Sequence, residues 1–183
     1  MKQNGYNTPP LSVIIAMYNS ERYIAQCLGS LLQQTFRDFE VIVADDCSTD
    51  KSVEIVSGLA PKFGGRLKLI QFKENSGRPS LPRNIAVKIA QGKYVTFLDN
   101  DDMLIPQALE VFVNTAEEWQ AEVVHTHSHY QNPKDMPQGD RMTFRMASFE
   151  HGNKANLQSP AYLLTNDMSE RMYNFSIYGI DWN

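Results

Sequence analysis

Short apolar runs alternate with longer stretches in which apolar residues recur every three or four positions, from about residue 12 to about residue 130. Short runs rich in β-branched residues and bounded by polar turns are typical of buried strands, whereas the longer spacing is typical of helices that bury one face. The pattern predicts strands at residues 12–16, 39–44, 67–72, 94–98 and 123–130. It predicts helices at residues 21–34, 51–59, 81–90, 105–119 and, in the tail, 167–174.

The order of these elements predicts the fold class. Strands that alternate with helices pair in parallel through right-handed crossovers. We therefore expect an α/β fold with a doubly wound, mostly parallel sheet and helices on both faces. This core is expected at residues 11–130, after a polar segment at residues 1–10 and before an irregular C-terminal region at residues 131–183. Ser20 is expected to cap the first helix, and Ser48 or Asp50 the second.

Polar residues follow three of the predicted strands. They are Tyr18 with Asn19, Asp45 with Asp46, and the acidic residues 99–102. Ligands of open α/β sheets bind at the carboxyl ends of the strands. The sequence therefore predicts that these side chains converge on one edge of the sheet.

Asp99, Asp101 and Asp102 crowd carboxylates directly after a strand. Mutual repulsion of such groups is offset by a cation, and hard oxygen ligands suit Mg²⁺ or Mn²⁺, which also bind the oxygens of a diphosphate. An acidic pair after a strand is also typical of a solvated turn that caps the next helix. Both interpretations stay open at this point.

The remaining candidates lie around the same edge. Asp46 can accept the imide N–H of a uracil ring, and Tyr18 either packs beside that ring or belongs to the core. Arg78 and Arg83 lie in or near a loop rich in turn-forming residues, and a guanidinium group can pair with diphosphate oxygens. Arg78 is the better candidate, because Arg83 can instead form a structural ion pair with the nearby carboxylates.

Residues 12–19, residues 39–50 and residues 75–102 together resemble family 2 glycosyltransferases of the GT-A fold, and the resemblance covers about residues 10–130. It implies an inverting transfer of a sugar from a nucleoside-diphosphate sugar, expected to be a UDP-sugar. The nucleotide contacts that it implies are Ala16, Tyr18, Asp46, Arg78, Asp99 and Asn100. It also implies that Asp101, with Asp99, holds Mn²⁺ or Mg²⁺.

The resemblance further implies a general base and an acceptor. The base is expected in a Glu-Asp pair, and none follows Asp102. Asp181 is the candidate that the chain offers, and we expect residues 131–183 to begin an acceptor-side region that continues in a longer protein. The acceptor is expected to be a saccharide or lipid-linked saccharide of bacterial-type cell-surface polysaccharide or glycolipid synthesis. We expect this chain to bind the donor and to transfer sugar negligibly.

Composition excludes some partners and favours one compartment. The net charge is −4 with Lys and Arg scattered along the chain, whereas nucleic-acid binding requires a concentrated basic face. The two cysteines, Cys27 and Cys47, have no metal-finger spacing, and no apolar run is long enough for a membrane span. We expect a cytoplasmic protein that attaches to the inner face of the membrane only peripherally.

Other functions stay open. A phosphatase of the haloacid dehalogenase type also has Asp-x-Asp after a strand, and a nucleotide-binding module without activity would keep the pocket alone. A response-regulator receiver also has clustered aspartates, but it needs a lysine at its fifth strand. His125, His127 and His129 alternate along a predicted strand and could bind zinc, although a half-exposed strand is the better interpretation.

Overall fold

The computed structural model describes residues 9–121, 123–125, 127–130, 143–146 and 162–165. Its centre is a six-stranded sheet of order β3-β2-β1-β4-β9-β6. The first four of these strands run parallel, whereas β9 is antiparallel to both of its neighbours. The strands are β1 (Leu11–Met17), β2 (Phe39–Asp45), β3 (Leu67–Gln71), β4 (Tyr94–Phe97), β6 (Val123–His125) and β9 (Tyr162–Thr165). The prediction of a mostly parallel, doubly wound sheet is confirmed.

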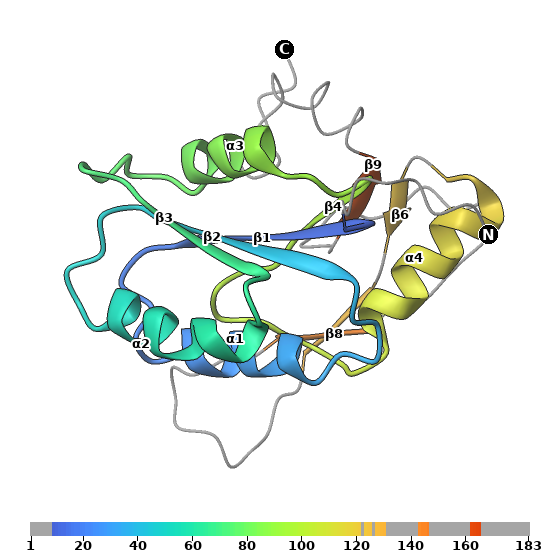
Figure 1. Cartoon of the computed structure of the whole chain (residues 1–183), viewed down its shortest axis with the longest axis horizontal. Helices are drawn as coiled ribbons and strands as arrows, with labels where there is room; N and C mark the ends of the chain where they lie inside the picture. The colour runs from blue at the N-terminus through green and yellow to red at the C-terminus, as the bar shows by residue number, and fades with distance from the viewer. Residues whose placement is uncertain (1–8, 122, 126, 131–142, 147–161, 166–183) are drawn as a thin grey trace.

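Helices cover both faces of this sheet. On one side lie α1 (Ile24–Leu32) and α2 (Ser52–Leu59), and on the other lies α3 (Ser80–Ile89) (Figure 1). The short 3₁₀ helix η1 (Ala60–Phe63) follows α2, and α4 (Ala108–Trp119) packs against β6 and β9.

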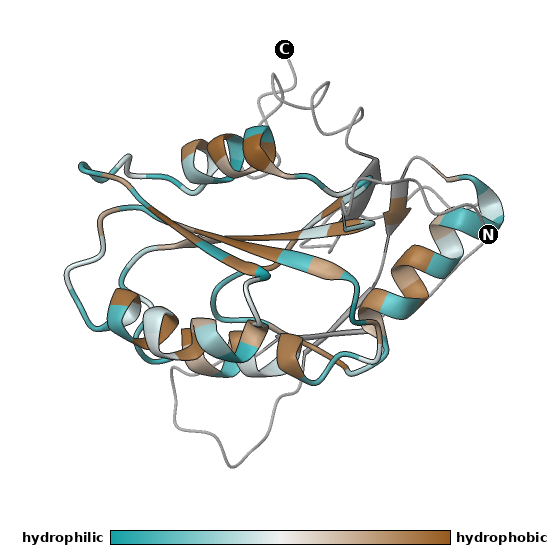
Figure 2. Ribbon diagram, in the orientation of Figure 1, coloured by the Kyte–Doolittle hydropathy of each residue, from teal (hydrophilic) through white to brown (hydrophobic). Residues whose placement is uncertain are grey.

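The pleat of the strands divides the core into two layers. Val13 and Ile15 of β1 face the cluster that includes α1, α2 and α4, whereas Ile14 faces the cluster that includes Ala86 of α3. Successive side chains of a strand point to opposite faces, so a strand covered on both sides is apolar at most of its positions. Figure 2 shows mostly hydrophobic colour along the central strands, with a few hydrophilic positions.

A small second sheet has the order β5-β8-β7. Its strands are β5 (Met103–Leu104), β8 (Thr143–Met146) and β7 (His127–Tyr130). The prediction of one strand at residues 123–130 is therefore wrong, because β6 and β7 belong to different sheets. His125 lies on β6, whereas His127 and His129 lie on β7, so the three histidines do not share one face of a single strand. The helix predicted at residues 167–174 lies outside the described residues.

The first helix begins later than predicted, and Ser20 does not cap it with its side chain. The Ser20 hydroxyl donates to the carbonyl of Tyr18 at 3.1 Å, while the Ser20 carbonyl accepts from the N–H groups of Tyr23 and Ile24. Residues 20–23 therefore form a turn that leads into α1. The N-cap position of α2 is Lys51, and the Asp50 carboxylate one residue earlier accepts the N–H of Ser52, the first residue of α2, at 2.9 Å.

Candidate functional site

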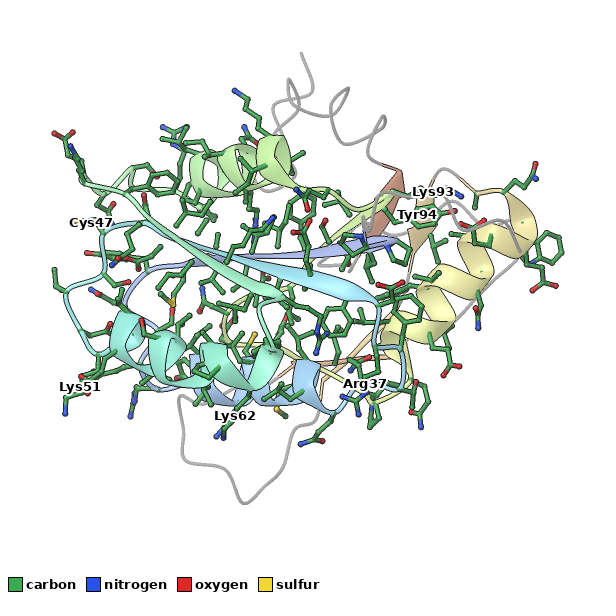
Figure 3. The ribbon with its side chains drawn as sticks, in the orientation of Figure 1. Arg37, Cys47, Lys51, Lys62, Lys93 and Tyr94 are labelled. Carbon is green, nitrogen blue, oxygen red and sulfur yellow. The ribbon has the colours of Figure 1, made fainter. Side chains whose placement is uncertain are left out.

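The carboxyl ends of β1 and β2, together with the segments after β3 and β4, enclose a pocket of about 310 Å³. This end of the sheet is marked in Figure 3 by Cys47, and the opposite end by Lys93 and Tyr94. Five of the residues expected to bind nucleotide line this pocket together: Ala16, Tyr18, Asp46, Arg78 and Asn100. The other lining residues are Met17, Asn75, Gly77, Pro79 and Pro82.

Tyr18 is presented to the pocket by a tight turn after β1. The next residue, Asn19, has a φ of 47°, in the left-handed region that asparagine tolerates better than most residues. The Asn19 N–H donates to Ser48 Oγ at 3.0 Å, and the Asn19 side-chain oxygen accepts the N–H of Thr49 at 2.8 Å. These bonds tie the turn to the loop after β2 and leave the Tyr18 side chain 48% exposed. The interpretation of Tyr18 as a core residue is therefore wrong.

Asp46 is 5% exposed and is held from two directions. Its N–H donates to the carbonyl of Met17 at 2.8 Å, which joins the ends of β2 and β1. The Ser76 N–H donates to both carboxylate oxygens of Asp46, with the nitrogen 3.0 Å from each. The Ser76 hydroxyl donates to Oδ2 at 2.9 Å. A carboxylate offers about four lone-pair positions, so Asp46 keeps acceptor capacity for a ligand N–H.

The loop that carries Arg78 is fixed to Asp46. The Asn75 side-chain amide donates to the Asp46 carbonyl at 3.1 Å, and the Gly77 N–H donates to Asn75 Oδ1 at 2.6 Å. Gly77 has a φ of 74°, which most L-residues adopt only with strain. Arg78 follows this turn as an exposed side chain on the pocket wall. A guanidinium group in this place can reach an anion bound in the pocket.

The segment after β4 closes the pocket on its other side. The Asn100 side-chain amide donates to the carbonyl of Ala16 at 2.9 Å. Arg83 is 8% exposed, forms an ion pair with Asp99 at 2.5 Å and lies over the ring of Phe97. The structural ion pair that the sequence offered as one role of Arg83 is therefore present. Neither Arg83 nor Asp99 lines the pocket.

Asp99 and Asp101 are the carboxylates expected to hold a cation. Asp101 is exposed, and Asp99 already accepts from Arg83. In the part of the chain that the structure describes, no group of three or more His, Cys, Asp or Glu side chains is arranged to hold a metal ion. Mg²⁺ is often bound by one or two carboxylates together with substrate phosphates and water. The donor set therefore fits a cation that arrives with a diphosphate, and a cage built from protein ligands alone does not occur among these residues.

Sequence reasoning missed half of the pocket wall and left one expected residue unplaced. Asn75 and Gly77 belong to a loop that was recognised for its turn formers, and the signal that singles them out is an Asn and a Gly two positions apart. Pro79 and Pro82 gave no chemical signal. Asp181, the candidate base, lies outside the described residues.

The chain belongs to glycosyl transferase family 2, whose family profile matches residues 12–178. It is 40% identical over 129 residues to poly(ribitol-phosphate) beta-N-acetylglucosaminyltransferase TarS of Staphylococcus aureus. It is 41% identical over 115 residues to poly(ribitol-phosphate) beta-glucosyltransferase of Bacillus spizizenii. These matches cover 69% and 62% of this chain but only 22% and 18% of the relatives. The chain thus spans about a fifth of their length.

Solved structures agree with this assignment. The crystal structure of residues 1–349 of S. aureus TarS in complex with UDP superposes with a TM-score of 0.74 and 32% identity, over 91% of this chain and 50% of that one. The TarS 1–349 complex with UDP-GlcNAc gives a TM-score of 0.64 and 40% identity, over 70% of this chain and 37% of that one. A mannosyltransferase from Pyrobaculum calidifontis, at 21% identity and a TM-score of 0.63, shares the fold. The GT-A fold expected from the sequence is confirmed.

Two further observations concern the helices and the cysteines of the described residues. None of the helices in the described ranges is long and apolar enough to cross a bilayer. Cys27 is buried, Cys47 is half-buried, and neither forms a disulfide.

Proposed function

We propose that this domain binds a nucleoside-diphosphate sugar, specifically a UDP-sugar, and serves an inverting glycosyltransferase. The observation that carries the proposal is the pocket at the carboxyl edge of the sheet, where a buried carboxylate and an exposed arginine face the same space. A uracil ring offers one N–H donor between two acceptors, which suits Asp46, and a diphosphate suits Arg78. The TarS complexes with UDP and UDP-GlcNAc support a uridine nucleotide.

Each candidate residue has a role in this proposal. Asp46 accepts the uracil N–H while Tyr18 packs beside the ring, and Ala16 and Asn100 form the wall next to them. Arg78 pairs with the diphosphate. Asp101, with Asp99, would hold Mn²⁺ or Mg²⁺, and the cation would supply Lewis-acid stabilisation of the charge on the departing diphosphate.

The acceptor side is a separate part of the proposal. We place the nucleotide-sugar-binding core at residues 11–130 and the start of the acceptor side at residues 131–183. A carboxylate base removes the proton of the acceptor hydroxyl as it attacks the anomeric carbon, and Asp181 is the candidate within this chain. The relatives are named for transfer to poly(ribitol-phosphate), which supports a bacterial cell-surface saccharide or lipid-linked saccharide as acceptor. Such chemistry fits the cytoplasmic face of the membrane.

Thermal unfolding with added nucleotides tests donor binding. UDP with Mn²⁺ or Mg²⁺ is expected to raise Tm more than ADP or GDP does, and UDP without metal to raise it little. A ligand that binds only the folded state stabilises it more as its concentration rises relative to its Kd, so at equal concentrations Tm reports both preferences. Equal shifts for all three nucleotides in the absence of metal would contradict the proposal.

Two aspartate variants separate the ligand role from the capping role. Asp101→Asn is expected to abolish the metal-dependent part of the UDP shift. Asp50→Asn is the matched control, because Asp50 accepts an N–H at the start of α2 and lies outside the pocket. It should lower stability only slightly, because Asn caps helices about as well as Asp does, and leave the nucleotide preference unchanged. If both variants behave alike, the assigned roles are wrong.

A nucleotide-binding module without activity is the second candidate, because the pocket alone does not supply a base. Incubation of a longer protein that contains this domain with UDP-GlcNAc and a poly(ribitol-phosphate) acceptor separates the two, since a glycosyltransferase releases UDP as it transfers the sugar and a binding module leaves UDP-GlcNAc intact. Membership of glycosyl transferase family 2 supports the transferase over the phosphatase alternative.

A further inference from the structure

The Ser76 hydroxyl faces two acceptors at the same distance. Its oxygen lies 2.9 Å from Asp46 Oδ2 and 2.9 Å from the carbonyl oxygen of Arg78. A serine hydroxyl has one hydrogen, so it can donate to only one of them at a time. The two acceptors belong to the two ends of the proposed nucleotide site, the nucleobase end and the diphosphate end.

The choice between these acceptors depends on what else binds Asp46. A hydrogen bond to a charged acceptor is stronger than one to a neutral carbonyl, so without ligand the hydroxyl favours the Asp46 carboxylate. A ligand N–H that donates to Asp46 occupies one of the acceptor positions of that carboxylate and partly offsets its charge. The hydrogen bond from the Ser76 hydroxyl to Asp46 is then weaker. The hydroxyl then turns more readily to the carbonyl of Arg78 and holds the loop that carries the guanidinium group.

We propose that the Ser76 hydroxyl couples recognition of the nucleobase at Asp46 to the placement of Arg78 against the diphosphate. Ser76 is a positioning residue, since it acts through Asp46 and Arg78 and does not itself line the pocket. The inference rests on the proposed function, because it takes a uridine nucleotide as the ligand. It deepens that function by making the two ends of the ligand bind cooperatively.

The surrounding loop supports a local action of this kind. The Ser76 N–H stays bonded to both oxygens of Asp46, and the Asn75 amide stays bonded to the Asp46 carbonyl. These bonds hold the start of the loop in place whichever way the hydroxyl points. Rotation of one hydroxyl therefore changes the restraint on Arg78 without any rearrangement of the fold.

The test is a double-mutant cycle read by calorimetric titration with UDP and Mn²⁺. The Kd is measured for the wild type, Asp46→Asn, Arg78→Ala and the double variant, and then for the same set with Ser76→Ala added. With Ser76 present, the effects of the two substitutions are expected to be coupled by about five-fold or more, the lower end of coupling between linked sites. With Ser76→Ala, the coupling should fall below about two-fold, because the shared hydroxyl is gone.

Matched variants keep the test specific to the hydroxyl. Ser76→Thr retains a hydroxyl and should keep the coupling. Ser76→Val has the shape of threonine without the hydroxyl and should lose the coupling. Ser80→Ala is the control at the start of α3, where the serine side chain has no hydrogen-bond partner in the described part of the chain. It should leave the coupling intact.

The outcomes distinguish the two proposals. If the coupling between Asp46→Asn and Arg78→Ala is the same with Ser76, Ser76→Ala and Ser76→Val, the inference is overturned. UDP binding by the wild type would still uphold the proposed function in that case. A wild type that does not bind UDP overturns both. Weaker UDP binding by Ser76→Ala with unchanged coupling means that Ser76 only stabilises the loop, and this also overturns the inference.

Discussion

At the scale of single residues, Gly92 lies where a loop packs closely against the central strand β1. A Cβ atom at this position would lie 2.5 Å from the backbone nitrogen of Ser12 and 2.7 Å from the carbonyl carbon of Leu11. The Gly92 N–H also donates to Ser12 Oγ at 2.9 Å. The neighbouring atoms are backbone of a buried strand, so they cannot move aside as a flexible side chain would.

Gly92→Ala is therefore expected to lower the free energy of unfolding by about 1–3 kcal/mol or more, the usual cost of forcing atoms into a packed core. Gly58→Ala is the control, since Gly58 lies within α2 and a Cβ there meets nothing within 4 Å. It should raise stability by about 0.5–1 kcal/mol. Urea unfolding of both variants measures these changes. Equal effects of the two substitutions would show that the contact with β1 is not tight.

The residues that could be predicted for the pocket are those that follow strands directly. Tyr18, Asp46 and Asn100 each come within three residues of a strand end, so the parallel order of the strands was enough to bring them together. Asn75 and Ser76 contact Asp46 across about 30 residues of sequence, and no local pattern reveals such hydrogen bonds. Loop geometry of this kind depends on the folded chain.

At the scale of elements, a buried carboxylate joins the starts of three strands. Glu40 of β2 is 4% exposed and accepts from Ser12 of β1 at 2.7 Å and from the Lys68 ammonium of β3 at 2.9 Å. It also accepts the N–H of Gln91, just after α3, at 2.6 Å. Burial raises the pKa of Glu40, but the hydrogen bonds from Lys68, Gln91 and Ser12 outweigh it and leave the pKa lowered.

This lowered pKa gives the fold a dependence on pH with a definite sign. The unfolded chain binds a proton at the ordinary value of 4.5, whereas the folded chain binds it only at lower pH. The stabilisation is therefore fully present above pH 4.5 and is lost as the pH falls through the lowered value. Glu40→Gln should lower the free energy of unfolding by about 1–3 kcal/mol at pH 7 and by less under acid.

Glu117→Gln is the matched control for that measurement. Glu117 pairs with Lys93 at 2.5 Å on the surface, with the two side chains 53% and 58% exposed. Hydrogen bonds from Lys93 and the Tyr94 hydroxyl lower the pKa of Glu117 as well. Solvent screens an exposed pair to about 0–1 kcal/mol, so this variant should change stability and its pH dependence less than Glu40→Gln does. If Glu40→Gln and Glu117→Gln change stability by the same amount at every pH, burial does not increase the contribution of the Glu40 hydrogen bonds to stability.

The elements themselves were predictable where periodicity was strong and local. The four parallel strands and the helices between them were predicted to within a few residues. The break between β6 and β7 and the strands β5, β8 and β9 were missed. β9 is four residues long and pairs with β4, which lies about 70 positions earlier in the chain. Pairing of so short a segment depends on its partners more than on its own sequence.

At the scale of the whole molecule, the pocket lies at one end of the parallel strands and the hydrogen bonds that join the strands through Glu40 lie at the other. The carboxyl edge carries the pocket, where segments near residues 16–18, 46, 75–79 and 100 meet. The opposite edge carries Glu40 and its partners, which hold the strands together. The separation predicts that ligands affect one edge of the sheet and leave local motions at the other unchanged.

Hydrogen exchange of backbone amides tests this separation. Three pocket amides have acceptors within the site: Asp46 to Met17, Ser76 to Asp46, and Gly77 to Asn75. With Mn²⁺ and UDP at about 100 times its Kd, openings that need an empty pocket become about 100-fold rarer, so these amides should slow together by about that factor. Gly64 and Arg66, whose amides close turns around η1 before β3 begins, exchange through local openings far from the ligand and should keep their rates. Slowing at Ser76 and Gly77 without slowing at Asp46 would mean that the loop binds UDP by itself, and that the carboxyl edge of the sheet does not act as one site.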